Sequence, residues 1–178
     1  MKPTKVKLTV GTIIVMLAIV MVFGGMAVAK SKSKTNANIE LARKIGEEVW
    51  SKGNMVVADQ IFSNEIVRHS ADIPDIRGKE AYKQFVLGTR AAFPDWKETV
   101  QNAIASGDLV ATQETITGTM TGSMQGPQGT LPPTGKRFET PVALFVRIAK
   151  GKIVEIWCYY DSAGILEAMG VLPPPPPK

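Results

Sequence analysis

The sequence of 178 residues is poor in side chains that bind metal ions, because it has one cysteine, Cys158, and one histidine, His69. A single cysteine excludes a disulfide bond within the chain. A zinc site of cysteine and histidine needs four ligands, which these two residues of one subunit cannot supply. We therefore predict no metal site, and we interpret Cys158 as a small, buried, hydrophobic residue on a strand.

Several enzyme signatures are absent as well. The sequence has no phosphate-binding loop, no ordered serine, histidine and aspartate, and no glycine motif for dinucleotides. Its net charge is +5, but six lysines lie within residues 1–34, which hold no acidic residue. The rest of the chain has 15 basic and 16 acidic residues, so we predict no basic face for nucleic acid.

One long hydrophobic run is present, from Leu8 to Ala29, and its 22 residues carry no charge. At about 1.5 Å per residue, such a helix spans the ~30 Å hydrocarbon core of a bilayer. A retained single-pass anchor is one interpretation. A cleaved signal peptide is the other, because lysines precede the run and Ala27-Val28-Ala29 fits the A-x-A cleavage pattern. A buried soluble helix is disfavoured, since no polar face interrupts the run. We expect a membrane-anchored or exported protein whose domain lies outside the cytoplasm.

Composition divides the chain into four parts. Residues 1–30 are the membrane-inserting segment, and residues 31–36 are a short polar linker. Residues 37–172 hold every segment with periodic apolar residues, so we predict one domain there. Residues 173–178 form a proline-rich tail that is too short to fold.

Helices are predicted in the first half of this domain and hairpin-linked strands in the second. The helices cover residues 39–52, 55–62 and 79–93, and Asn36 or Asn38 caps the first of them. The strands cover 96–105, 109–121, 137–149 and 153–161, and a last helix covers 162–169. This order indicates an α+β fold, in which helices cover one face of a curved antiparallel sheet.

Alternation along two strands predicts a pocket wall. One face of the strand 109–121 carries Val110, Thr112, Glu114, Ile116 and Met120. One face of the last strand carries Ile153, Glu155, Trp157, Tyr159 and Asp161 if the alternation is unbroken. Such a mixture of carboxylates and aromatic rings suits the wall of a pocket better than a plain core or a solvated face.

Short sequence words in a fixed order carry a resemblance to a known family. They are Val67-Arg68-His69, Gly78-Lys79-Glu80, Phe93-Pro94-Asp95, residues 105–108 (ASGD), residues 118–122 (GTMTG), Pro133-Thr134-Gly135, and residues 151–157 (GKIVEIW) followed by Asp161 and Gly164. In this order and spacing, residues 37–172 resemble the SnoaL-like polyketide cyclases and ester cyclases. The resemblance implies the cone-shaped fold of nuclear transport factor two, with no metal or organic cofactor and with dimers that pair through the open face of the sheet.

The resemblance also implies catalytic residues. An aspartate at the end of the last strand serves the family as general acid and base in an intramolecular aldol ring closure, and Asp161 matches its position. A carboxylate in a partly dry pocket is a better base than one in water. Asp161 also precedes a predicted helix, so capping is its alternative role. His69 is a second candidate because a neutral ring can relay protons near pH 7, the alternative being a satisfied or exposed histidine.

Four residues are candidates for substrate contact. Glu114 in the middle of a strand either faces solvent or points into a cavity. Trp157 and Tyr159 either stack on a flat ring or belong to the core. Met120 lies on the predicted pocket face of its strand.

Together these observations predict a membrane-delivered domain that binds a small, apolar, oxygenated molecule and cyclises or isomerises it. The alternative is a non-catalytic module that binds a ligand or dimerises. Met120 and Ile156 stand where the family often carries histidine, and apolar residues at these positions favour binding over proton transfer.

Overall fold

The computed structural model describes residues 33–126 and 129–173, and a compact unit begins at Ala37. The hydrophobic run Leu8 to Ala29 lies outside these residues. Within the two described ranges, no helix has the length and apolar character needed to cross a membrane.

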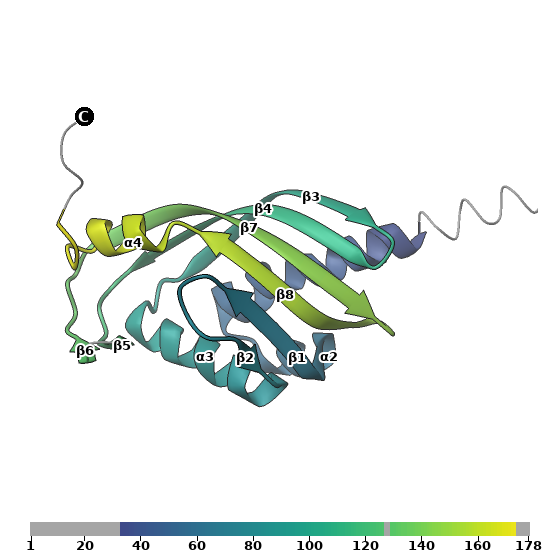
Figure 1. Ribbon diagram of the computed structural model, residues 1–178, viewed down its shortest axis with the longest axis horizontal. Helices are drawn as coiled ribbons and strands as arrows, with labels where there is room; N and C mark the ends of the chain where they lie inside the picture. The colour runs from purple at the N-terminus through teal and green to yellow at the C-terminus, as the bar shows by residue number, and fades with distance from the viewer. Residues whose placement is uncertain (1–32, 127–128, 174–178) are drawn as a thin grey trace, which may run out of the picture. The chain divides into compact units, whose positions relative to one another are not determined.

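Six strands form one curved sheet in the order β2-β1-β8-β7-β4-β3 (Figure 1). Their bounds are β1 (Phe62–Ser70), β2 (Ile76–Arg77), β3 (Lys97–Ser106), β4 (Leu109–Thr119), β7 (Arg137–Ala149) and β8 (Lys152–Tyr160). A separate hairpin contains β5 (Met124–Gly126) and β6 (Gly129–Leu131). The α+β class is confirmed, together with the four predicted strands.

The sheet is mixed, so the prediction of a purely antiparallel sheet is wrong. Strands β3, β4, β7 and β8 pair antiparallel, whereas β1 lies parallel to β8. The sequence does not predict β1 or β2, because Ser63-Asn64-Glu65 interrupts the apolar alternation of β1. A parallel partner that is far away along the chain also leaves no hairpin signal.

The helices follow the prediction closely except at the first N-terminus. They are a helix over residues 33–44 that continues as the π-helical η1 (Ile45–Trp50), then α2 (Met55–Ile61), α3 (Lys79–Ala92) and α4 (Ser162–Ala168). Residues 33–36, predicted as linker, are therefore helical. Neither Asn36 nor Asn38 is the predicted cap, because both lie within this helix. The Asn38 amide donates instead to the carbonyl oxygen of Gly107 at 3.1 Å. Asn54 caps α2 by accepting from the Val57 N–H.

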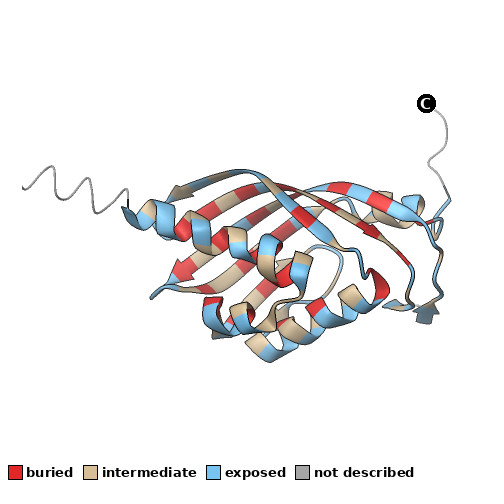
Figure 2. Cartoon of the chain, turned by 180° about the vertical axis from the view of Figure 1, so that it is seen from behind, coloured by how far each residue is buried: buried red, intermediate tan, exposed pale blue. Residues whose placement is uncertain are grey.

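The core lies between one face of the sheet and the helices. Figure 1 shows α2 and α3 against the same side of the curved sheet, and Figure 2 shows buried residues alternating with exposed ones along the strands. The face of β4 that was predicted as a pocket wall is buried, since Val110, Thr112, Glu114 and Ile116 are all at most 7% exposed. Two polar side chains, Thr112 and Glu114, thus lie within the core.

A bulge in β8 reverses the prediction for the last strand. Arg147 of β7 pairs with Glu155 and Ile148 pairs with Ile153, so Val154 has no partner of its own. An extra residue of this kind shifts the alternation by one position. Ile156 and Cys158 consequently point into the core, as predicted for Cys158, whereas Trp157 and Tyr159 turn to the outer face of the sheet.

Candidate functional site

A small cavity lies between the helices and the sheet. Its apolar wall is formed by Trp50, Ile116, Val142, Leu144, Ile156 and Cys158. Three polar side chains complete the lining, namely Arg68 from β1, Tyr82 from α3 and Glu98 from β3. The volume open to the centre of a water-sized molecule is about 20 Å³. This volume holds about one water molecule or one oxygen-bearing group.

Arg68 brings a buried positive charge to the cavity. The residue is 5% exposed, and its guanidinium carbon lies 5.0 Å from the centre of the Phe85 ring. Its Nη1 atom has no hydrogen-bond partner among the described residues. A buried donor without an acceptor costs roughly 1–3 kcal/mol, and more when it is charged. Arg68 Nη1 is therefore a donor in need of an acceptor.

Tyr82 supplies a second donor. The ring is 1% exposed, and its oxygen accepts a hydrogen bond from the Trp50 indole N–H at 3.0 Å. Burial raises the pKa of Tyr82 above its ordinary value, so the hydroxyl keeps its proton. Within the described ranges, that proton has no acceptor. Arg68 and Tyr82 thus bring two unused donors to the lining of one cavity.

Glu98 and Glu114 form a buried pair of carboxyl groups. Glu98 is 6% exposed and Glu114 is 1% exposed, and their carboxyl groups lie close enough to share a proton. The Trp96 indole N–H donates to Glu98 Oε1 at 3.1 Å. The Thr112 hydroxyl donates to Glu114 Oε1 at 2.6 Å. Two ionised carboxylates in this position would repel each other strongly, so the pair is stable only if one of them carries a proton.

The π-helical segment η1 approaches this pair of carboxyl groups at Gly46. A Cβ atom at that position would lie 2.9 Å from Glu98 Oε2 and 3.1 Å from Glu114 Oε2. Both oxygens therefore converge beneath one glycine. Glu114 Oε2 is buried and has no hydrogen-bond donor as long as both carboxyl groups are ionised. A proton on Glu98 supplies the missing donor.

Asp161 lies outside this cluster. Its carboxylate caps α4, with Oδ1 accepting from the Gly164 N–H at 2.9 Å, and the residue is exposed. The structure therefore gives Asp161 the capping role that the sequence offered as one alternative. Its role as a base stays a prediction.

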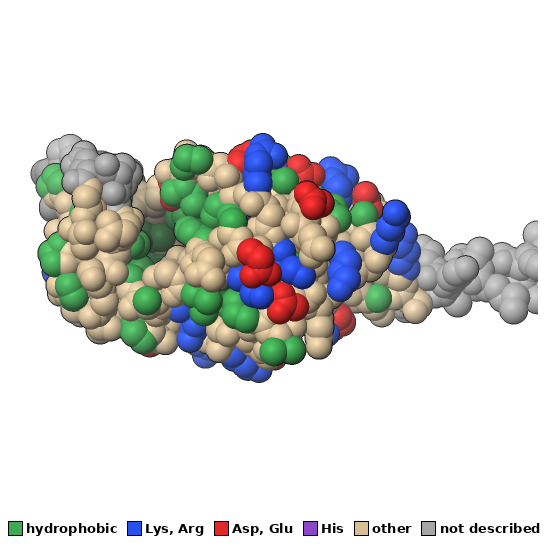
Figure 3. Space-filling model, turned by 90° about the horizontal axis from the view of Figure 1, so that it is seen from below, with side chains coloured by type: hydrophobic (Ala, Val, Ile, Leu, Met, Phe, Trp, Pro, Cys, Tyr) green, Lys and Arg blue, Asp and Glu red, His purple; other side chains and the backbone are tan. Residues whose placement is uncertain are grey.

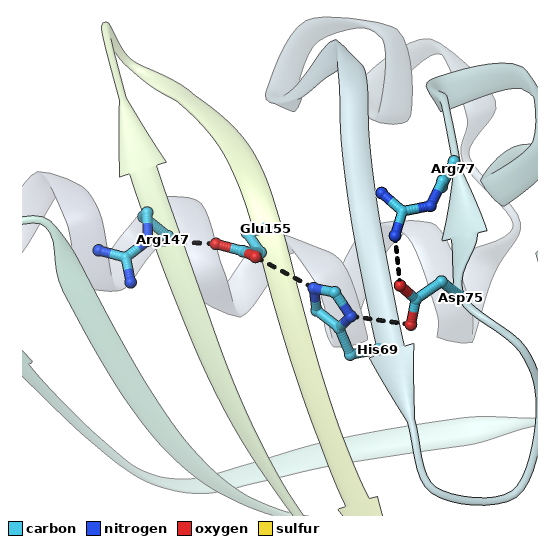
Figure 4. A network of polar contacts seen from close by, with 5 residues as sticks. All are labelled: His69, Asp75, Arg77, Arg147 and Glu155. Carbon is cyan, nitrogen blue, oxygen red and sulfur yellow. Dashed lines mark hydrogen bonds and ion pairs between the residues drawn. The ribbon is translucent and has the colours of Figure 1, made fainter.

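His69 also lies away from the cavity, in a network on the outer side of the sheet (Figure 4). Its Nδ1 atom is 2.8 Å from Asp75 Oδ1, and its Nε2 atom is 3.0 Å from Glu155 Oε1. The ring stacks on Trp157 at 5.6 Å between centres. Arg147 holds the other oxygen of Glu155 at 3.3 Å. His69 is therefore a satisfied histidine that links β1, the following loop and β8.

The two carboxylates around His69 predict a pH dependence of stability. Burial alone would lower the pKa of His69, but hydrogen bonds to Asp75 and Glu155 outweigh it and raise that pKa. The resulting stabilisation is complete below the unfolded pKa and is lost as the pH rises through the folded one. For a partly exposed group we expect roughly 0.5–1 kcal/mol. Urea unfolding of wild type and His69→Gln should differ at about pH 5.5 and converge at about pH 8.5. Equal differences at both pH values would contradict the bridging role.

The remaining predicted contact residues are scattered. Tyr159 is 54% exposed on the outer face, where its ring meets the edge of Phe145. Trp157 lies on the same face beside His69 and so is not part of the cavity wall. Met120 is fully buried in the core and, within the described part of the chain, does not line the cavity. Of the six predicted site residues, the structure brings only Glu114 to the buried polar cluster.

The sequence reasoning missed Arg68, Tyr82 and Glu98. Arg68 lies in the motif Val67-Arg68-His69, in which only the neighbouring His69 was predicted to be catalytic. Glu98 pairs with Ile116 in the ladder between β3 and β4. An acidic residue opposite an apolar residue on a buried face was the signal that could have identified it.

Comparisons with known proteins agree with this fold. The family model described as SnoaL-like polyketide cyclase matches residues 40–169. No curated protein sequence matches the chain. A candidate SnoaL-like polyketide cyclase from Jannaschia sp. CCS1 has a TM-score of 0.70 and 22% identity, over 78% of this chain and 95% of its own. A candidate polyketide cyclase from Streptomyces antibioticus has a TM-score of 0.62 and 27% identity, over 75% and 98%. An epoxide hydrolase of M. tuberculosis described as LEH-like shares the fold, with a TM-score of 0.62 and 13% identity, over 78% and 92%.

Proposed function

This chain belongs to the SnoaL-like polyketide cyclase family, and from that premise we propose that its cone binds a small apolar molecule through a carbonyl or carboxylate oxygen. The observation that carries the proposal is the buried, unpartnered Nη1 atom of Arg68, a residue that lines the cavity. An oxygen placed there accepts from a guanidinium nitrogen that otherwise lacks an acceptor. Such a charge-assisted hydrogen bond is among the stronger polar contacts in proteins.

The rest of the lining supports an apolar ligand with one polar end. The wall opposite the donors is hydrophobic, with Ile116, Leu144 and Ile156 as its aliphatic part. A cavity of about 20 Å³ takes the oxygen-bearing end of a molecule, and a larger body requires these side chains to move apart. Figure 3, viewed from below, shows a hollow flanked by hydrophobic side chains near the end of the domain that contains β5 and β6.

A ligand panel tests the proposal on the full chain. Small ketones, esters and carboxylates are compared with hydrocarbons of the same shape by thermal melting and calorimetric titration. We expect the oxygenated compounds to bind and raise the melting temperature, because ligand that binds only the folded state stabilises it. Equal binding of ketone and hydrocarbon would show that no donor in the cavity recognises oxygen, and it would remove the proposal.

We also propose, from family membership, that the bound molecule is cyclised or isomerised with Asp161 as a base. Asp161→Asn keeps an N-cap of about equal quality, whereas Asp161→Ala loses about 1 kcal/mol of stability. If Asp161 is the base, turnover falls roughly a hundredfold or more in both variants, while only the alanine variant melts lower. Turnover that is unchanged in Asp161→Asn, measured on the ketones and esters that bind, would exclude this role.

A non-catalytic ligand-binding module is the second candidate. It is favoured by the use of Asp161 as an exposed helix cap and by the apolar side chains of Met120 and Ile156, which supply no proton. Binding without turnover in every variant of Asp161 would support it.

We propose that the hydrophobic run Leu8 to Ala29 delivers this domain to a membrane, either as an anchor or as a cleaved signal. The support is its uncharged length and the Ala27-Val28-Ala29 pattern. Cell fractionation followed by intact mass measurement tests both versions. Full-length protein found only in the cytosol would contradict them.

We propose in addition that the outer face of the sheet pairs with a second copy of the chain. This face exposes large hydrophobic side chains on three strands, with Ile104 72%, Tyr159 54% and Phe145 40% exposed. Apolar patches of this kind often mark interfaces. Light scattering should give the mass of a dimer for wild type and of a monomer for Tyr159→Lys. A wild-type monomer would contradict the proposal.

A further inference from the structure

We propose that Glu98, supported by Glu114, is an acid–base group of the cavity and interconverts the keto and enol forms of a bound carbonyl compound. This inference rests on the proposed binding of a carbonyl oxygen at Arg68 and Tyr82. It adds a reaction, and it assigns that reaction to residues other than Asp161.

Position is the first support. Glu98 lines the same cavity as Arg68 and Tyr82, and it is fixed from behind by the Trp96 indole N–H at 3.1 Å. Arg68, which also lines that cavity, is more than nine-tenths buried and has an unpartnered Nη1 atom. A carbonyl oxygen held by Arg68 and Tyr82 is therefore brought to a site whose wall includes a carboxyl group.

The proton count of the pair is the second support. Glu114 accepts from Thr112 through Oε1, and among the described residues a protonated Glu98 is the donor that its buried Oε2 needs. Burial, and then the negative charge of Glu114, raise the pKa of Glu98 well above its usual range, against the opposing effects of Trp96 and Arg68. Burial also raises the pKa of Glu114, while the bond from Thr112 lowers it. The proton therefore resides on Glu98.

Among the described residues, five other titratable groups lie near the pair, and none of them takes the place of Glu98 as the proton donor to Glu114. They are Arg43 and Glu47 of the N-terminal helix, Arg68 of β1, Tyr82 of α3 and Cys158 of β8. Burial raises the pKa of Cys158 to about 12, so its thiol stays neutral. Arg43 and Glu47 carry opposite charges and form an ion pair at 3.6 Å.

The reaction needs no co-reactant. The proton that Glu98 shares with Glu114 passes from Glu98 to the carbonyl oxygen, and the resulting Glu98 carboxylate takes a proton from the adjacent carbon. The electron pair of that C–H bond becomes the C=C bond, and the π pair of the carbonyl becomes a lone pair on the new hydroxyl. Glu98 ends protonated, as it began. The enol is the species from which isomerisation or an intramolecular aldol closure proceeds. Arg68 and Tyr82 stabilise charge that develops on the oxygen.

Deuterium exchange of acetone tests this step without knowledge of the natural substrate. Acetone is small, and enolisation in heavy water replaces its methyl protons, which proton NMR follows directly. The full chain should accelerate this exchange, and Glu98→Gln should lower the acceleration roughly a hundredfold or more, the usual scale for acid–base catalysis. Glu155→Gln, which alters a carboxylate on the outer face, is the control and should leave the exchange unchanged.

Glu114 acts through Glu98, so its test is a pH profile. In Glu114→Gln the side-chain amide donates to Glu98 and favours its ionised form. We expect the exchange activity of this variant to move to lower pH. Stability gives an independent readout, because a raised folded pKa makes wild type lose stability as pH rises from the unfolded pKa of about 4.3. Glu98→Gln, which imitates the protonated acid, should lose less stability over that range.

The outcomes separate this inference from the function on which it rests. Binding of acetone by ligand-observed NMR, with exchange no faster than in buffer, would overturn the inference and leave the binding proposal intact. Exchange in Glu98→Gln at the wild-type rate would overturn it as well. If neither acetone nor any carbonyl compound of the panel binds, the binding proposal fails and the inference fails with it.

Discussion

Replacing Arg68 with methionine is expected to weaken binding of a carbonyl ligand by about tenfold to a hundredfold. The substitution keeps most of the side-chain volume but removes the guanidinium whose Nη1 atom lacks a partner at the cavity. A hydrogen bond to a charged group is worth about 1.5–3 kcal/mol, and each 1.4 kcal/mol is a tenfold change in affinity. Calorimetric titration with the ketones that bind wild type measures the loss.

Arg147→Met is the matched control for this substitution. Arg147 lies on the outer side of the sheet, where it bonds Glu155 and Asp108 and stacks over Trp157. Its loss should leave ketone affinity unchanged. Cooperative melting of Arg68→Met shows that the variant is folded. A folded Arg68→Met variant with wild-type affinity would contradict the assignment of Arg68 as the oxygen-binding residue.

Replacing Gly122 with alanine is expected to destabilise the domain by about 3 kcal/mol, which lowers the melting temperature by roughly 10 °C. Gly122 lies against the end of α3, where its N–H donates to the carbonyl oxygen of Ala92 at 3.0 Å. An added Cβ atom would overlap the carbonyl oxygen of Ala91 and lie 3.0 Å from the Cα atom of Ala92. These are backbone atoms, so relief requires α3 or the loop to shift.

Gly88→Ala provides the control on the same helix. Gly88 is exposed within α3, and no other atom lies within 4 Å of the Cβ atom that alanine would add. Alanine at an exposed helical position stabilises by about 1 kcal/mol relative to glycine. Thermal and urea unfolding of both variants should therefore move in opposite directions. A Gly122→Ala variant as stable as wild type would show that α3 and this loop do not pack closely.

Most of the fold was predictable because its elements carry local signals. Turn residues mark the hairpins of β3, β4, β7 and β8, and the apolar spacing of α3 ends at a proline. Strand β1 was not predictable in this way, since its place in the sheet depends on parallel pairing with β8. Periodicity within a segment carries no information about a partner almost a hundred residues away.

The candidate site was predicted only in part, and the bulge at Val154 is the main reason. One unpaired residue turned Trp157 and Tyr159 outward and placed Ile156 and Cys158 inside. Alternation alone predicts the opposite. Glu114 was located because β4 has no bulge between residues 110 and 118. Its partner Glu98 could be found only when β3 and β4 were paired in their actual register.

A crystal structure with a bound ketone tests the central claim most directly. The ketone of the panel with the highest affinity is soaked into or crystallised with the full chain. We predict its carbonyl oxygen within hydrogen-bond distance, about 2.7–3.2 Å, of Arg68 Nη1, with the hydrocarbon part against the apolar wall of the cone. A ketone seated on the outer face of the sheet, with Arg68 Nη1 still without an acceptor, would contradict it.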